Sequence, residues 1–89
     1  MSLPDRVKEI VYRFLRRRRT AYVQTFCSPV GEEVLRDLAP FCHAHKSTFH
    51  PDPRIHGVLE GRREVWLRIQ HHIQLSDDAL WKLYAKDPT

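Results

Sequence analysis

The sequence contains little glycine and little cysteine, and it has no long apolar run. Three glycines among 89 residues are too few for a phosphate-cradling loop, and neither Gly-x-Ser-x-Gly nor His-Glu-x-x-His occurs. No apolar stretch approaches the roughly 20 residues that cross a bilayer, and no signal-peptide pattern is present. We therefore expect no catalytic residues, no cofactor and no membrane span, in a protein that is soluble and intracellular when it is made.

Two cysteines, Cys27 and Cys42, supply the only thiols. In an intracellular chain such thiols are more often free and partly buried than bridged. A chain of 89 residues is expected to form one helical domain, residues 1–89. Its core is then so small that its stability is marginal unless partners contribute.

Positive charge is concentrated at the beginning of the chain. The formal net charge is +4, with an isoelectric point near 9.4. Residues 1–27 hold seven lysines and arginines against two acidic residues, whereas residues 28–89 hold eight against nine. This asymmetry suits contact with nucleic acid or with an acidic protein surface, and a solvated helix face is the alternative interpretation.

Apolar periodicity predicts an all-α fold, a small bundle of three main helices plus a short C-terminal helix. The basic N-terminal helix is expected over residues 5–26, and a second helix begins at Ser28-Pro29, because serine caps a helix and proline suits its first turn. Ile55–Leu75 is the longest amphipathic stretch, and we expect it to form the central helix against which the others pack. The short C-terminal helix is expected over residues 77–86.

Proline and glycine predict where these helices end and touch. Pro40 is expected to end or kink the second helix, and Pro53 helps to keep residues 43–54 free of helix. Gly31 and Gly61 lie within helical patterns, where glycine is unfavourable. We therefore expect another backbone to come close at each of them.

The run Arg16-Arg17-Arg18-Arg19 does not form a single patch, since successive helical residues turn by about 100°. On the predicted helix Arg18 points into the apolar face, whereas Arg17 and Arg19 flank it. A helix-turn-helix is not expected, because no short turn joins two helices ahead of a polar reading helix. The candidates for non-specific phosphate contacts are Lys8, Arg13, Arg16, Arg17, Arg19 and Arg63.

Two arginines, Arg18 and Arg62, stand where their helix patterns require apolar residues. A buried guanidinium without a partner is costly, so we expect structural ion pairs, with Asp37 as the partner of one of them. The alternative is that both side chains pack their stems and keep their charged heads in water.

The short C-terminal helix needs a surface on which to dock. Leu80, Trp81 and Tyr84 lie on its apolar side, and we expect them to form an interaction surface. This side either completes the core or holds a neighbouring subunit.

The six histidines raise the question of a metal site. Together with Cys42 they offer enough ligand types, but their spacing fits no familiar zinc module. Scattered surface histidines are the commoner explanation, so no metal site is expected.

Three sequence elements stand out by their order and spacing. They are Phe26-x-Ser28-x-x-Gly31-x-x-Val34-Leu35-x-Asp37-Leu38-x-x-Phe41-Cys42, Ser47-Thr48-Phe49 and Glu60-Gly61-Arg62-Arg63-Glu64-Val65. Together they resemble a family of small structural-domain proteins of tailed bacteriophages, typified by a Bordetella phage protein. The resemblance covers residues 26–73 and leaves out both the arginine-rich helix and the segment from Ser76.

The resemblance implies a non-enzymatic virion structural protein, made in the host cytoplasm and assembled into the head interior, the head–tail neck or the set of proteins ejected with the genome. The implied partners are other virion proteins, further copies of the same chain in a homo-oligomer, and packaged DNA contacted through its phosphates. A small basic nucleic-acid-binding accessory protein is the alternative function.

Overall fold

The computed structural model describes residues 3–86, which form four α-helices and contain no strand. Helix α1 spans Asp5–Phe26, α2 spans Pro29–Phe41, α3 spans Pro53–Gln74 and α4 spans Asp77–Lys86. The predicted all-α class is confirmed. The bounds expected for the first and last helices, 5–26 and 77–86, are those observed.

Polar caps and prolines determine where two of the helices begin. Ser28 caps α2 by accepting a hydrogen bond from the Gly31 N–H at 3.0 Å. Asp52 caps α3 by accepting from the Arg54 N–H at 2.9 Å. Helix α3 therefore begins at Pro53, earlier than expected, because proline blocks the interior of a helix but fits its first turn.

Helix α2 ends in a Schellman turn and not at its proline. Pro40 lies inside the last turn, and the helix continues to Phe41. His43 adopts a left-handed φ of 52°, and its N–H bonds the Pro40 carbonyl at 3.2 Å. The Ala44 N–H bonds the Ala39 carbonyl at 2.9 Å, which completes the motif that satisfies the last carbonyl groups of a helix.

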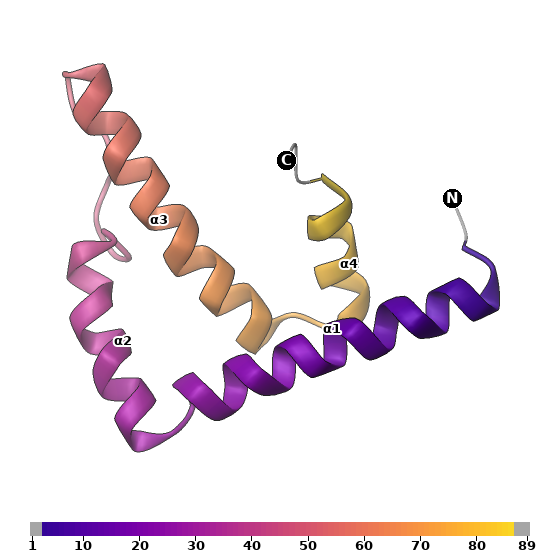
Figure 1. Ribbon diagram of the computed structural model, residues 1–89. Helices are drawn as coiled ribbons and strands as arrows, with labels where there is room; N and C mark the ends of the chain where they lie inside the picture. Colours follow the sequence, from indigo (N-terminus) through magenta and orange to yellow (C-terminus); the bar gives the residue numbers. More distant parts are fainter. Residues whose placement is uncertain (1–2, 87–89) are drawn as a thin grey trace.

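Helix α1 is the element against which the other three helices pack (Figure 1). From its C-terminal end α2 turns away, and after the connecting loop α3 runs back to α1 (Figure 1). Helix α4 stands on α1 farther towards the N-terminal end of that helix (Figure 1). The prediction that Ile55–Leu75 is the central helix is therefore wrong. The buried residues of α3, Ile69 and His72, lie only near its C-terminal end.

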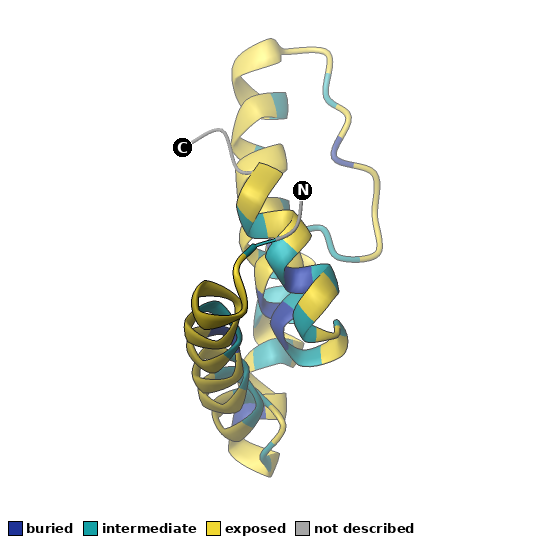
Figure 2. Ribbon diagram, turned by 90° about the vertical axis from the view of Figure 1, so that its right-hand side faces the viewer, coloured by how far each residue is buried: buried dark blue, intermediate teal, exposed yellow. Residues whose placement is uncertain are grey.

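The four helices lie in a thin, open layer (Figure 2). The molecule measures 47 × 33 × 16 Å, and its radius of gyration is 15.6 Å, against about 12 Å for a compact domain of this length. Its accessible surface is 7003 Å², whereas a compact protein of 10.6 kDa exposes about 5,500 Å². The predicted bundle arrangement is not confirmed, because the helices diverge from α1 and leave roughly 1,500 Å² of extra surface in water.

The two glycines that were expected to mark close contacts behave differently. A Cβ at Gly31 would collide with the Thr25 carbonyl oxygen and would lie 2.6 Å from the Phe26 Cα, so the beginning of α2 rests directly on the end of α1. A Cβ at Gly61 would meet nothing within 4 Å. The expected close approach is confirmed at Gly31 and is wrong at Gly61.

Substituting these two glycines should change stability in opposite directions. Gly31→Ala forces the α1–α2 contact apart and should lower the free energy of unfolding by about 2 kcal/mol. Gly61→Ala adds a better helix former in open space and should raise it by roughly 0.5–1 kcal/mol. Urea unfolding followed by circular dichroism measures both. Equal effects of the two substitutions would contradict the contact at Gly31.

Candidate functional site

Helices α1, α3 and α4 are joined by a series of packed rings centred on His72, which we call the aromatic joint. The buried imidazole of His72 stacks on the Tyr22 ring with 4.3 Å between centroids. The His72 Nε2 lies 2.7 Å from the Tyr84 hydroxyl, and the Tyr84 ring meets the Phe14 ring edge-on at 6.2 Å. These four side chains bring all three helices together at one place.

Burial favours the neutral form of His72, and its hydrogen bonds identify which ring nitrogen carries the proton. Its Nδ1 lies 2.7 Å from the Arg68 carbonyl oxygen. Because a carbonyl only accepts, Nδ1 carries the proton and Nε2 accepts from the Tyr84 hydroxyl. Burial is the largest cause that lowers the pKa of His72 from 6.5, and the cationic side chains of Arg68 and Arg18 lower it further. The hydrogen bond to the Arg68 carbonyl acts against these effects on the pKa.

Two carboxylates at the beginning of α4 attach that helix to α1, at the end where the helix dipole favours negative charge. The Tyr12 hydroxyl donates to Asp78, and Arg19 forms an ion pair with Asp77. The hydrogen bond to Asp78 is the main cause that raises the pKa of Tyr12 above 10.0. Arg19, a candidate for phosphate contact in the sequence, is instead half-buried and committed to Asp77.

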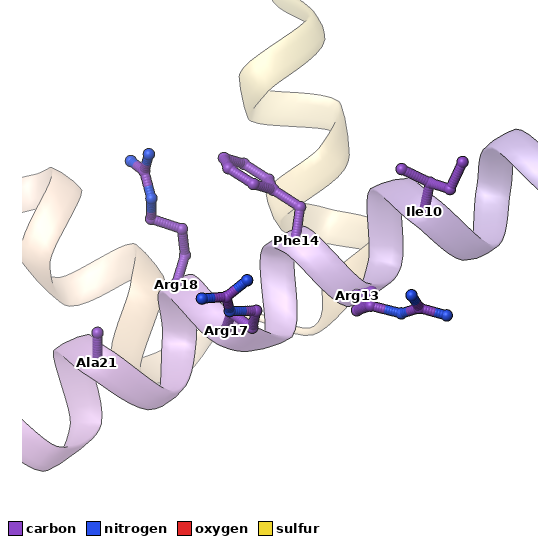
Figure 3. Close-up of a pocket in the computed structure, with 6 residues that line it drawn as sticks. All are labelled: Ile10, Arg13, Phe14, Arg17, Arg18 and Ala21. Atoms are coloured by element: carbon purple, nitrogen blue, oxygen red, sulfur yellow. The ribbon is translucent and has the colours of Figure 1, made fainter.

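One side of α1 carries uncovered apolar side chains beside arginines (Figure 3). Ile10 is 60% exposed and Phe14 is 46% exposed, and with Ala21 they line a shallow hollow. Arg13 and Arg17 border the same hollow from the adjoining side of the helix (Figure 3). We call these five residues the open face of α1. It is the candidate interaction site with both apolar and charged character.

The buried side of α1 does not coincide with the apolar face expected from the sequence. Leu15 is buried and Tyr22 is half-buried, and Arg19 turns towards this side. Arg18, which the pattern placed inside, is exposed, and its guanidinium lies 4.9 Å from the centroid of the Phe14 ring. The reason is that only one half of the broad apolar face of α1 is covered by α3 and α4.

The ion pairs expected for Arg18 and Arg62 are not formed in the part of the chain that the structure describes. The half-buried Arg62 places its guanidinium 4.1 Å above the centroid of the Phe41 ring, and Asp37 is exposed without an ion pair among residues 3–86. Contact with an aromatic face satisfies a cation while leaving part of it in water, so the costly burial of an ion pair is avoided. For Arg18 the solvated alternative describes the structure better.

The remaining phosphate-contact candidates divide into exposed and structural groups. Arg13, Arg16 and Arg17 are exposed on α1 and border a common hollow, with Arg13 also 4.0 Å from Glu9. Lys8 is exposed, with its ammonium group 5.8 Å from the centroid of the Tyr12 ring. These four cations are the ones whose charge is directed to solvent.

Arg63 belongs to the structural group. Its guanidinium donates to the His43 carbonyl at 3.2 Å and to the Lys46 carbonyl at 3.0 Å. It thereby fastens the turn after α2 to α3. This position replaces the phosphate-contact role expected from the sequence.

The apolar side of α4 is only partly an interaction surface. Leu80 is 1% exposed and belongs to the core, so its assignment to an interaction surface is corrected. Trp81 and Tyr84 are half-buried and line a second apolar hollow together with Ile10 and Phe14. The helix thus completes the core with one residue and extends the apolar surface with two others.

The histidines serve mainly as hydrogen-bonding groups. The His43 Nδ1 lies 3.1 Å from the Ser47 carbonyl, and the His56 Nδ1 lies 3.0 Å from the Thr48 carbonyl, as the His72 Nδ1 does with Arg68. Within residues 3–86 no group of three or more histidine, cysteine, aspartate or glutamate residues converges as metal ligands would. Both thiols are free, as predicted, with Cys42 buried and Cys27 exposed.

The fold and these surfaces define a small, flat, all-helical protein with uncovered apolar faces. None of its described helices is both long enough and apolar enough to cross a membrane. Residues 22–85 match the family described as Bbp19-like phage protein, and the chain belongs to this bacteriophage protein family. The match is wider than the resemblance over residues 26–73, because it includes α4, and it leaves Arg13 and Arg17 outside. No curated protein and no solved structure matches the chain.

The aromatic joint should make stability depend on pH. Folding lowers the pKa of His72. As the pH falls through about 6.5, His72 is therefore protonated in the unfolded chain but not in the folded one. The free energy of unfolding falls over this range, down to the lowered pKa of the folded state. Between pH 7.5 and 5.5 this loss should be smaller in His72→Gln than in the natural protein. Thermal unfolding measures it, and the exposed His45 provides the control His45→Gln, which should keep the full pH dependence. An identical dependence in both variants would contradict a neutral, buried His72.

Proposed function

We propose that this protein is a non-enzymatic structural component of the phage particle that assembles with further copies of itself and with other virion proteins. Membership of a bacteriophage protein family supports the setting. The observation that carries the proposal is the amount of apolar surface that the single chain leaves in water. Exposed large apolar residues occur on all four helices and in the loop: Val7, Ile10, Phe14, Val30, Val34, Phe41, Phe49, Ile55, Val58, Val65, Leu67 and Leu83.

Such exposure fits a subunit better than a solitary protein. Contiguous apolar patches on soluble proteins usually mark interaction sites. A flat chain with about 1,500 Å² more surface than a compact one gains the missing burial when neighbouring subunits cover it. The particle supplies many identical neighbours, so this surface has partners throughout assembly.

The hollows described along α1 favour a binding role over catalysis. Their walls consist of apolar and arginine side chains with Thr20, Gln24 and Tyr84, and these hollows contain neither a cysteine nor a histidine. A nucleophile or an acid–base pair placed together is what a catalytic site requires. We therefore assign these hollows to protein contact.

A structural role requires that the protein be present in finished particles at fixed copy number. Quantitative mass spectrometry of purified virions should find a constant ratio of this chain to the major capsid protein across preparations. The same measurement after genome release locates the protein: retention indicates a shell or neck position, and loss with the DNA indicates an ejected component. Absence from purified particles would refute the proposal.

A second candidate function, a small accessory protein that binds nucleic acid, is favoured by one observation. Arg13, Arg16 and Arg17 lie exposed and close together on α1. Guanidinium groups in such a row suit phosphate contacts that are indifferent to base sequence. An accessory binder would act on free DNA and would be absent from purified particles, so the two functions are separable.

DNA contact through these three arginines predicts a defined salt dependence. Each phosphate contact releases about one counterion, so the slope of log K against log salt concentration should be about −3. Arg17→Gln should reduce the slope by about one, and Arg36→Gln, at an exposed arginine of α2, should leave it unchanged. Fluorescence anisotropy with a short duplex measures the slopes. A steep slope that is insensitive to Arg17→Gln would rule out this surface.

A further inference from the structure

Helix α2 presents an exposed apolar row with acidic residues beside it. Val30 is 76% exposed, Val34 is 45% exposed and Phe41 is 54% exposed. At about 100° per residue these three side chains fall within one narrow sector of the helix, and Glu33 and Asp37 fall next to it on one side. Both acidic residues are exposed and form no ion pair among residues 3–86. We call these five residues the open face of α2.

The open faces of α1 and α2 are complementary in charge. On α1 the apolar row Ile10, Phe14 and Ala21 is bordered on one side by Arg13 and Arg17, and Arg18 borders it on the other side with its guanidinium over the Phe14 ring. On α2 an apolar row is bordered by two carboxylates. Each charged pair has the i, i+4 spacing that places both groups on the same side of a helix. Guanidinium and carboxylate groups at such a rim steer association and determine which surfaces meet.

The two faces also agree in length and register. From Ile10 to Ala21 and from Val30 to Phe41 the chain advances by the same number of residues, about 16 Å along a helix. In an antiparallel arrangement Ile10 stands opposite Phe41, and Ala21 stands opposite Val30. The same register brings Arg13 to within one residue of the level of Asp37 and Arg17 to within one residue of the level of Glu33, an offset of about 1.5 Å along the helix.

The side on which the charges lie selects this orientation. Around each helix axis, at about 100° per residue, the charged pair lies on the same side of its apolar row: Arg13 and Arg17 on α1, and Glu33 and Asp37 on α2. Two helices that face each other bring such flanks together only when they run antiparallel, because a parallel arrangement places the flanks on opposite edges of the contact. The charges and the apolar rows therefore agree on one arrangement.

The two faces do not meet within one chain. Helix α2 already rests on the end of α1 through Gly31, which lies on a different side of α2 from the apolar row. Arg13 and Glu33 are both exposed in the single chain. The open face of α2 is therefore available to another copy.

We propose that the open face of α2 of one copy docks antiparallel on the open face of α1 of a second copy. The contact is head-to-tail, so each subunit uses both faces and the assembly grows into a closed ring or an open filament. The inference deepens the proposed self-assembly and rests on it for its biological setting only.

Charge reversal tests the contact directly. Sedimentation velocity of the full chain over a concentration series measures self-association. Arg13→Glu/Arg17→Glu and Glu33→Lys/Asp37→Lys should each weaken association at least tenfold, because like charges then face each other. Carrying all four substitutions in one chain should restore association to within about threefold of the natural protein. Circular dichroism confirms that each variant keeps its helices.

A control with the same change in net charge separates a specific contact from a general charge effect. Lys8→Glu/Arg16→Glu alters two exposed cations of α1 that lie outside the open face. This variant should associate as the natural protein does. Weakening equal to that of Arg13→Glu/Arg17→Glu would overturn the proposal.

Mixing two blocked variants distinguishes a head-to-tail contact from a symmetric one. Ile10→Glu blocks only the open face of α1, and Val30→Arg blocks only that of α2. Each variant alone should remain monomeric, and an equimolar mixture should form dimers that do not grow further, because only one intact pair of faces remains. A symmetric contact between like faces would give no such recovery.

Other occupants of these faces give different results. A chain that stays monomeric at several hundred micromolar, or one that associates unchanged in both charge-reversed variants, would overturn the proposal. Binding of the monomer to anionic phosphatidylserine vesicles through Arg13 and Arg17 would assign the open face of α1 to a lipid surface instead. Mass spectrometry of virions separates failure of this contact from failure of the proposed virion role. A protein that is present in particles but does not self-associate keeps its virion role and refutes this contact. A protein that self-associates but is absent from particles keeps this contact and refutes the virion role.

Discussion

The structure depends on the stacking and hydrogen bonding of one buried imidazole. His72 reaches Tyr22 on α1 and Tyr84 on α4 at once, and its protonation state is the one that both hydrogen bonds require. Without this residue α3 and α4 would each touch α1 through separate, smaller contacts. Because an uncharged imidazole is stable in that position only when both ring nitrogens have partners, His72 is held in one orientation between the three helices. The contacts of Asp77 and Asp78 with α1 are a second attachment for α4.

Joining the helices at one place has a consequence for the rest of the surface. Elements that meet near one point diverge away from it, and the exposed halves of α1, α2 and α3 follow from that divergence (Figures 1 and 2). The apolar residues on these halves remain largely in water in the single chain, although the Phe14 ring also meets Tyr84 in the aromatic joint. They are therefore available for the contacts between chains proposed above, in which a neighbouring chain would add to the burial of each copy.

The existence of the helices and most of their boundaries were predictable from the sequence because they depend on local chemistry, although α3 begins two residues earlier than expected. Ser28 identifies the beginning of α2, and the predicted limits of α1 and α4 were correct. The part of the apolar face of α1 that other helices bury was not predictable, because a broad apolar face does not specify which half of it meets another helix. That is why Arg18 was expected inside the apolar face and Arg19 only at its flank, and why α3 was expected at the centre. His72 was missed since a polar residue in an apolar pattern signals burial only when its partners are known.

The distribution of the family match bears on what the open faces are for. The open face of α2 lies inside residues 22–85, whereas the open face of α1 lies outside that match. One half of the proposed contact thus lies within the part that defines the family, and the other half lies in the part that does not. In the proposed contact Arg13 and Arg17 supply the charges on the α1 side, and charges at the edge of a contact give specificity through repulsion of wrong partners. If copies associate as proposed, the arginines of α1 bear on which copies assemble together, although they lie outside the part of the chain that matches the family.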